Sequence, residues 1–179
     1  MTLTPGLRKF VRTAHVTFTV GWLGTVAAFL ALAVVGLTNQ DDQVVRAAYI
    51  AMELITRFVI VPLSIAPLLT GPILSLGTPW GLFRHYWILA KLLINILSTI
   101  ILLVHIQPIN YLSRVAAEGT LSSADRAVQV QLVVAAGAGL LALLVATALA
   151  VYKPRGMTPY GWRKQYEERT VSPAVDAGT

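Results

Sequence analysis

The sequence contains no cysteine and few charged residues. Without cysteine there is no disulfide framework, thiolate metal site or catalytic thiol. Charged residues make up only 12% of the 179 residues, apolar residues make up 56%, and the mean hydropathy is +0.69. A soluble domain of this size would not stay in solution with so apolar a composition. The composition therefore predicts an integral membrane protein.

Motifs of soluble enzymes are also missing. The chain has no phosphate loop, no G-x-S-x-G, no H-E-x-x-H and no dinucleotide-binding fingerprint. The net charge is +6, but the basic residues lie at the ends of hydrophobic runs instead of forming a stripe interleaved with aromatics. That distribution is typical of membrane topology and argues against nucleic acid as a partner.

Four apolar stretches are long enough to cross a bilayer, for which a helix needs roughly 20 residues. They cover about 13–37, 44–76, 84–106 and 128–152. We therefore expect an all-α protein, with a transmembrane four-helix bundle at 1–152. The remaining residues, 153–179, are expected to form a basic, partly disordered cytoplasmic tail. The break at 107–126 leaves room for a short interfacial helix.

The positions of the basic residues predict the orientation. On one side of a four-span chain lie Arg8, Lys9, Arg12, Arg84, Lys153, Arg155, Arg163, Lys164 and Arg169. The charges on the other side nearly cancel or are acidic, so both termini are expected in the cytoplasm. A cleaved secretory signal is the competing interpretation of the first span. The run from Ala14 to Leu37 is longer than a signal core, which favours a retained helix.

The third span carries polar residues that share one helical face. They are Arg84, Lys91, Asn95, Ser98 and His105, together with Leu102. Since a charge in a span costs about 3 kcal/mol near the helix centre, this face is expected to look toward other helices. Lys91 has two open interpretations, a functional cation or a lysine that extends its amine back to the cytoplasmic surface.

The second span is expected to present a similar stripe. Glu53 and Arg57 are spaced as an i, i+4 pair that can neutralise itself in the membrane, and Arg57 is expected near mid-membrane with Asn95. Pro62, Pro67 and Pro72 are expected to make the inner half of this span irregular. This irregularity is either a hinge or the ordinary presence of proline in membrane helices. The fourth span, rich in Ala and Gly, is expected only to pack.

The three histidines are the natural candidates for metal or haem ligation. His15 and His85 each lie near the cytoplasmic boundary and are expected at similar depth, whereas His105 lies at the other surface. The alternative for each is a hydrogen-bonded anchor at the membrane interface.

Three stretches carry a resemblance to known families: HVTFTVGWLG, RFVIVPLSIAPLLTG and TPWGLFRHYWILAKLL. Over residues 14–105 they resemble the membrane domains of CopD-type copper-resistance proteins and HemJ-type haem-biosynthesis proteins. Those proteins share a His-x6-Trp first helix, a second helix that ends in Thr-Gly, and a lysine in a later helix. The matching positions here are His15 with Trp22, Thr70 with Gly71, and Lys91.

The resemblance implies a helical bundle in the bacterial cytoplasmic membrane. For the HemJ-type branch it also implies b-type haem and protoporphyrinogen oxidation, with His15 as a haem ligand and Lys91 as an essential lysine. In this interpretation His85 or another group lies opposite His15, and Lys91 with Arg84 meets the carboxylates of haem or porphyrin. The expected cofactor-binding set is thus His15, His85, Lys91, Arg84 and Trp22, with no metal beyond haem iron.

Two alternatives remain open at this stage. One is transport or metal handling, motivated by Glu53, Arg57, Asn95 and Lys91, although the supply of soft ligands for copper is poor. The other is a non-enzymatic assembly role, in which the buried polar residues hold helices together and the tail docks a membrane partner or a second copy.

Overall fold

The computed structural model describes residues 4–77 and 81–171, and nearly all of them are helical. The connection between the second and third expected spans and the end of the expected tail lie partly outside these residues, at 78–80 and 172–179. The elements are α1 (Pro5–Thr38), α2 (Asp42–Ile55), η1 (Thr56–Ile60), α3 (Val61–Leu76), α4 (Tyr86–Glu118), η2 (Ser123–Asp125), α5 (Arg126–Tyr152) and α6 (Pro159–Val171).

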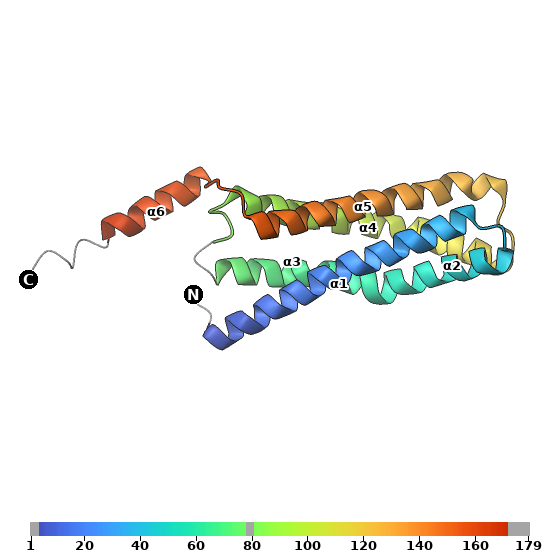
Figure 1. Cartoon of the computed structure of the whole chain (residues 1–179), viewed down its shortest axis with the longest axis horizontal. Coiled ribbons are helices and arrows are strands. Elements are labelled where there is room, and N and C mark those ends of the chain that lie inside the picture. Colours follow the sequence, from blue (N-terminus) through green and yellow to red (C-terminus); the bar gives the residue numbers. More distant parts are fainter. Residues whose placement is uncertain (1–3, 78–80, 172–179) are drawn as a thin grey trace, which may run out of the picture.

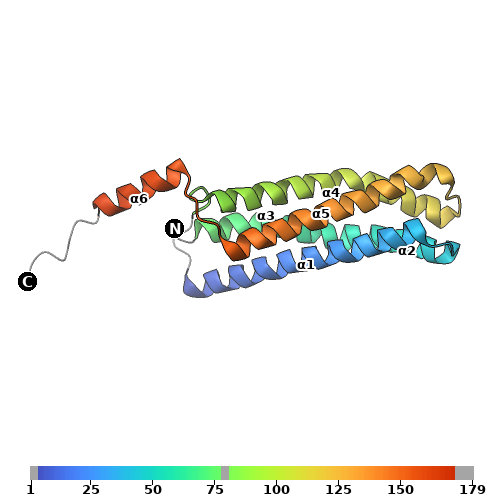
Figure 2. The ribbon, with the colours of Figure 1, turned by 45° about the horizontal axis from the view of Figure 1, so that its top comes forward.

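Four helical segments are long and apolar enough to cross a membrane: Pro5–Thr38, Asp42–Leu76, Tyr86–Glu118 and Ser123–Tyr152. This confirms the prediction of an all-α chain with four candidate spans. The segments run up and down in turn, each packs against its neighbours in the chain, and α5 returns to pack on α1 (Figures 1 and 2). The result is a closed four-helix ring.

The two ends of the bundle differ. The start of α1, the end of α3, the start of α4 and the end of α5 lie together, and we call this the terminal end (Figure 1). The loop end holds the short connections from α1 to α2 and from α4 to α5. α6 projects away from the terminal end in both views.

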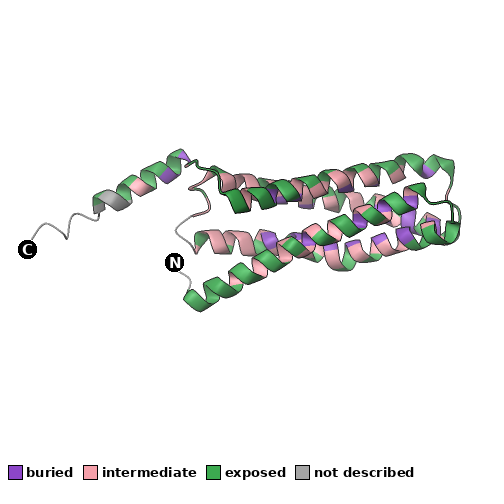
Figure 3. Ribbon diagram, viewed as in Figure 1, coloured by how far each residue is buried: buried purple, intermediate pink, exposed green. Residues whose placement is uncertain are grey.

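Burial is uneven along the bundle axis. The core cluster includes Trp22, Phe29, Tyr49, Leu112 and Leu132, whereas none of the described residues of α1 before Trp22 is buried. Figure 3 shows the same trend along α1, with exposed and half-buried residues toward the terminal end. The bundle is therefore tightest toward the loop end.

Two helices are longer than the apolar runs predict. α1 begins at Pro5, and α4 continues to Glu118 through a stretch predicted to be a connection. Pro108 lies inside α4, and the helix ends where Gly119 adopts a left-handed conformation with φ 70°. Hydropathy marks the part of a helix that suits lipid, whereas a C-cap marks where the helix ends, so the two boundaries differ.

The irregularity in the second span lies at mid-span, not in the inner half as predicted. η1 is a π-helical turn, and α3 is a regular α-helix through Pro67 and Pro72. The amide of Val61 donates to the carbonyl of Thr56, five residues earlier. A proline ring clashes with the carbonyl four residues before it, and the wider turn directly before Pro62 gives that ring room.

Backbone pairing ties the tail to the start of α4. The amide of Thr158 donates to the carbonyl of Arg84 at 3.0 Å, next to the isolated bridge between His85 and Met157. The Thr158 hydroxyl donates to the carbonyl of Phe83 at 2.5 Å and accepts from the amide of Gly161 at 3.1 Å. One buried threonine therefore caps α6 and attaches it to the connection before α4.

Candidate functional site at the terminal end

His15 joins the first and second spans at the terminal end. Its Nδ1 lies 2.8 Å from the hydroxyl oxygen of Thr70. The imidazole also packs on Gly71, where an added methyl group would come within 3.3 Å of its Cε1 atom. Thr70 and Gly71 thus both contact the Nδ1–Cε1 edge of the ring, one by a hydrogen bond and one by close packing.

The hydrogen bonds of Thr70 determine which ring nitrogen of His15 carries the proton. The Thr70 hydroxyl donates its single hydrogen to the carbonyl of Ala66 at 2.8 Å. Toward His15 it can then only accept, so Nδ1 of His15 is the donor. A neutral imidazole with its proton on Nδ1 leaves the lone pair of Nε2 available as a ligand.

Lys91 belongs to the same end of the bundle. Its ammonium lies 5.8 Å from the ring centroid of Trp87, one turn earlier on α4. The side chain is half-buried. The aromatic face stabilises the cation without neutralising it.

Acidic residues are absent from the surrounding sequence. No Asp or Glu occurs in 1–40, 54–117 or 127–166. The acidic residues of the bundle therefore lie in its loop-end half, with Asp41, Asp42, Glu118 and Asp125 at or near the connections, and Glu53 in α2. Lys91 consequently lies in a part of the bundle that offers no carboxylate counter-ion.

The other residues predicted for the site are placed as follows. His85 lies directly before α4, with its ring centroid 6.3 Å from that of Trp87. Arg84 is in the same connection, and its backbone pairs with Thr158. Trp22 is 2% exposed and belongs to the core, two turns along α1 from His15.

The polar network predicted from Glu53, Arg57 and Asn95 does not come together. Among the described residues, no ion pair within 4 Å joins Glu53 to Arg57; Arg57 is exposed and Glu53 is half-buried. Residues four apart lie on the same face only in a continuous α-helix. Arg57 lies in the π-helical turn, which holds an extra residue and so rotates the side chains that follow relative to those of α2.

Arg57 is also far from Asn95 along the bundle axis. Thr70 is level with His15, and Arg57 lies about thirteen residues, or roughly 20 Å, from Thr70 toward the loop end. Asn95 is buried on α4, only one turn beyond Lys91. The two residues are therefore at different depths.

His105 lies toward the loop end and belongs to a different part of the bundle. Its Nδ1 donates to the carbonyl of Ile101 at 2.8 Å, and its Nε2 lies 3.5 Å from the side-chain nitrogen of Gln131. This arrangement agrees with the anchoring alternative for His105.

Sequence reasoning gave no role to Trp87, and Thr70 and Gly71 entered only as part of a resemblance. No helical period links α1 to α3, so the contact between His15 and Thr70 follows only from packing. The available signal was the Thr-Gly pair near the inner end of the second span.

The described residues contain no group of three or more His, Cys, Asp or Glu side chains that could hold a metal ion. Nε2 of His15 could supply one ligand to an iron that a porphyrin already holds, which needs no such cluster. Comparisons with protein-family models, curated proteins and solved structures found no match for this chain.

Proposed function

We propose that the chain is a multi-pass protein of the bacterial cytoplasmic membrane that binds haem b and takes part in redox chemistry. Its terminal end faces the cytoplasm in this proposal, because the basic residues gather there. The suggested activity comes from the resemblance to HemJ-type and CopD-type membrane domains.

The observation that carries the proposal is the orientation of His15. Its Nδ1 donates to Thr70, so Nε2 is the nitrogen that can bind iron. Ligating histidines typically donate their other ring N–H to a neighbouring oxygen, which fixes the ring and raises its basicity. Thr70 supplies that second interaction from a different span.

Lys91 supplies the second part of the argument. A cation that is half-buried among apolar helices and has no carboxylate in its half of the bundle is costly unless an anion accompanies it. The propionate groups of haem are carboxylates that can pair with such a cation. Haem, when bound, would supply one-electron chemistry at its iron.

The fit of haem can be tested against the packing around His15. Its ring is half-buried, and no residue of α1 from Pro5 to Gly21 is buried, so this end of the bundle is open compared with the core. A ligand would therefore reach His15 from the lipid or from the terminal end. The lone pair of Nε2 on His15, the cation of Lys91 and the open packing at this end of the bundle are all compatible with a bound porphyrin that carries carboxylates.

The test is the absorption spectrum of the purified full chain. We expect a reduced-minus-oxidised haem spectrum, lost in His15→Leu and retained in His105→Leu, which alters a histidine at the other end. Folding of both variants is checked by gel filtration. A folded wild-type protein that retains no haem and takes up none when it is added would overturn the proposal.

A second candidate is a non-enzymatic role in membrane assembly. The supporting observation is α6, which Thr158 fixes to the bundle and which exposes Tyr160, Trp162 and Tyr166. If a strain lacking the gene is fully complemented by a His15→Leu, Lys91→Met double variant but not by a chain ending at Tyr152, the assembly role replaces the haem proposal.

A further inference from the structure

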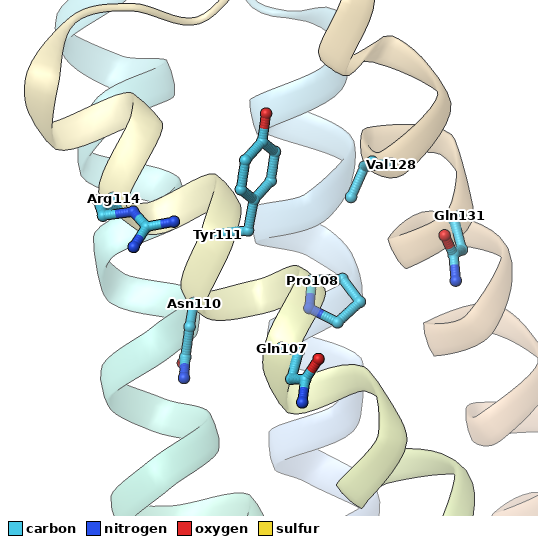
Figure 4. Close-up of a pocket in the computed structure, with 7 residues that line it drawn as sticks. All are labelled: Gln107, Pro108, Asn110, Tyr111, Arg114, Val128 and Gln131. Atoms are coloured by element: carbon cyan, nitrogen blue, oxygen red, sulfur yellow. The ribbon is translucent and has the colours of Figure 1, made fainter.

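An apolar cavity lies near the middle of the bundle, where α4 and α5 line it together with Trp22, Phe29 and Ile60, and a groove lies between α4 and α5 toward the loop end. The cavity has a volume of about 220 Å³ and is lined mostly by apolar side chains, among them Leu97, Ile101 and Gly139. The groove has a volume of about 540 Å³ and is lined by Gln107, Tyr111 and other largely polar residues (Figure 4). The groove shares no residue with the expected cofactor-binding set, and the cavity shares only Trp22 with it.

The two spaces meet at a boundary of polarity. On α4 the apolar run ends at Ile106 and is followed by Gln107, while on α5 Gln131 precedes a long apolar run. His105 lines the cavity, Gln131 lines the groove, and their side chains lie 3.5 Å apart. Both helices therefore change from polar to apolar at the same height.

Small residues on α5 create the cavity. Ala138 and Gly139 line it, and a methyl group added at Gly139 would have no atom within 4 Å. Ala138, Leu97 and Ile101 are also exposed, so the cavity opens sideways between α4 and α5. Cavities of about 150 Å³ with apolar linings stay free of water and accept apolar molecules. In a bilayer, the apolar groups that surround such an opening are the acyl chains of lipids.

The groove has the complementary chemistry. Figure 4 shows Gln107, Tyr111 and Arg114 on the α4 wall, with Gln131 on the α5 wall. Arg114 contributes the cation of this lining, and the nearby carboxylate of Asp125 already accepts from the Tyr111 hydroxyl and from Ser122. Arginine and side-chain amides are suitable donors to a phosphate.

We propose that the groove and cavity between α4 and α5 bind one glycerophospholipid, with an acyl chain in the cavity and the phosphate at Arg114. The match of polarity to membrane depth favours a lipid over a soluble ligand, because the apolar part of the site adjoins the apolar part of each helix. This site does not depend on the haem proposal, because neither His15 nor Lys91 lines the cavity or the groove.

Native mass spectrometry of the full chain in detergent tests the proposal. The probes are phosphatidylglycerol, phosphatidylcholine with the same acyl chains, and glycerol phosphate. We expect one tightly retained phospholipid per chain and no competition from glycerol phosphate. Gly139→Leu, which fills the cavity, should weaken lipid binding at least tenfold. Gly137→Leu is the matched control, because Gly137 also has open space around it but does not line the cavity.

Arg114→Gln tests the phosphate contact. It should weaken binding of both phospholipids about three- to tenfold, as expected for one charge-assisted contact near the surface. If Gly139→Leu does not fold, Ala138→Leu takes its place, because Ala138 lines the cavity at its exposed mouth.

Three results would overturn the proposal. The first is equal lipid binding by the cavity-filling variant and Gly137→Leu. The second is competition by glycerol phosphate at the same concentration as the lipid, which would indicate a headgroup site alone. The third is a dimer that Gly139→Leu abolishes without any change in lipid binding, which would make this surface an interface between two copies.

Discussion

The Nδ1 atom of His15 and the hydroxyl oxygen of Thr70 lie 2.8 Å apart and connect the first and second spans. Because Thr70 uses its own hydrogen for Ala66, the contact also fixes the proton of His15 on Nδ1. The orientation of the candidate iron ligand thus depends on a residue more than fifty positions away in the sequence.

Thr70→Val should therefore affect ligand binding more than folding. The side chain keeps its shape but loses the acceptor, so haem retention should fall about tenfold, as when other oriented ligands lose a supporting contact. The loss of unfolding free energy should be about 1 kcal/mol. Thr19→Val is the control, because that hydroxyl donates only to carbonyls of its own helix. Unchanged haem content in Thr70→Val would contradict the assigned orientation.

Lys91→Met should separate function from stability. Removing a half-buried cation with no carboxylate nearby should leave the melting temperature in detergent equal or higher, since the charge is costly among apolar helices. Haem uptake should fall about tenfold through loss of the charge-assisted contact. Lys9→Met, at an exposed position before the apolar run, serves as the control. A lower melting temperature with normal uptake would instead assign Lys91 a structural role.

Gly36→Ala should destabilise the bundle. The added methyl group would lie 2.7 Å from Cζ of Tyr49, a buried ring that cannot easily move. Overpacking of this kind costs about 1–3 kcal/mol. The comparison is Gly24→Ala, where the added methyl group meets nothing within 4 Å. Thermal unfolding of both variants in the same detergent measures the difference, and equal melting temperatures would show that α1 and α2 can separate slightly at this point.

Thr158→Val should loosen α6. The change removes both the bond to the Phe83 carbonyl and the cap on the Gly161 amide. Loss of an N-cap costs about 1 kcal/mol, so hydrogen exchange of the first α6 amides should become several-fold faster. In Thr170→Val, by contrast, the lost hydroxyl bonds only to carbonyls of α6 itself, and exchange at the start of α6 should not change.

The orientation can be tested by labelling with thiol reagents. The chain has no cysteine, so Gln40→Cys and Arg155→Cys each introduce a unique and exposed thiol at opposite ends of the bundle. A membrane-impermeant maleimide should label Gln40→Cys in intact spheroplasts and Arg155→Cys only after lysis. The reverse pattern would place the termini, and the candidate site at His15, outside the cytoplasm.

Part of the candidate site could be predicted from the sequence. His15 and Lys91 were identified as candidates, and both lie in the half of the bundle toward the terminal end. The pairing of Glu53 with Arg57 was wrong because it assumed an uninterrupted α-helix across η1. The fourth span, expected only to pack, provides the small residues that open the cavity beside α4. A helix rich in Ala and Gly can either pack tightly against its neighbour or leave a cavity beside it. Which of the two occurs depends on the side chains of the opposite helix.

The sequence by itself determined that this chain is helical and has four segments suited to a membrane. Those properties depend on the hydropathy of neighbouring residues, summed over a stretch of about twenty positions. The tertiary structure alone decided which residues meet across helices, such as His15 with Thr70 and Thr158 with Phe83. Contacts of this kind depend on the relative height and rotation of packed helices. A single π-helical turn before Pro62 is enough to change both.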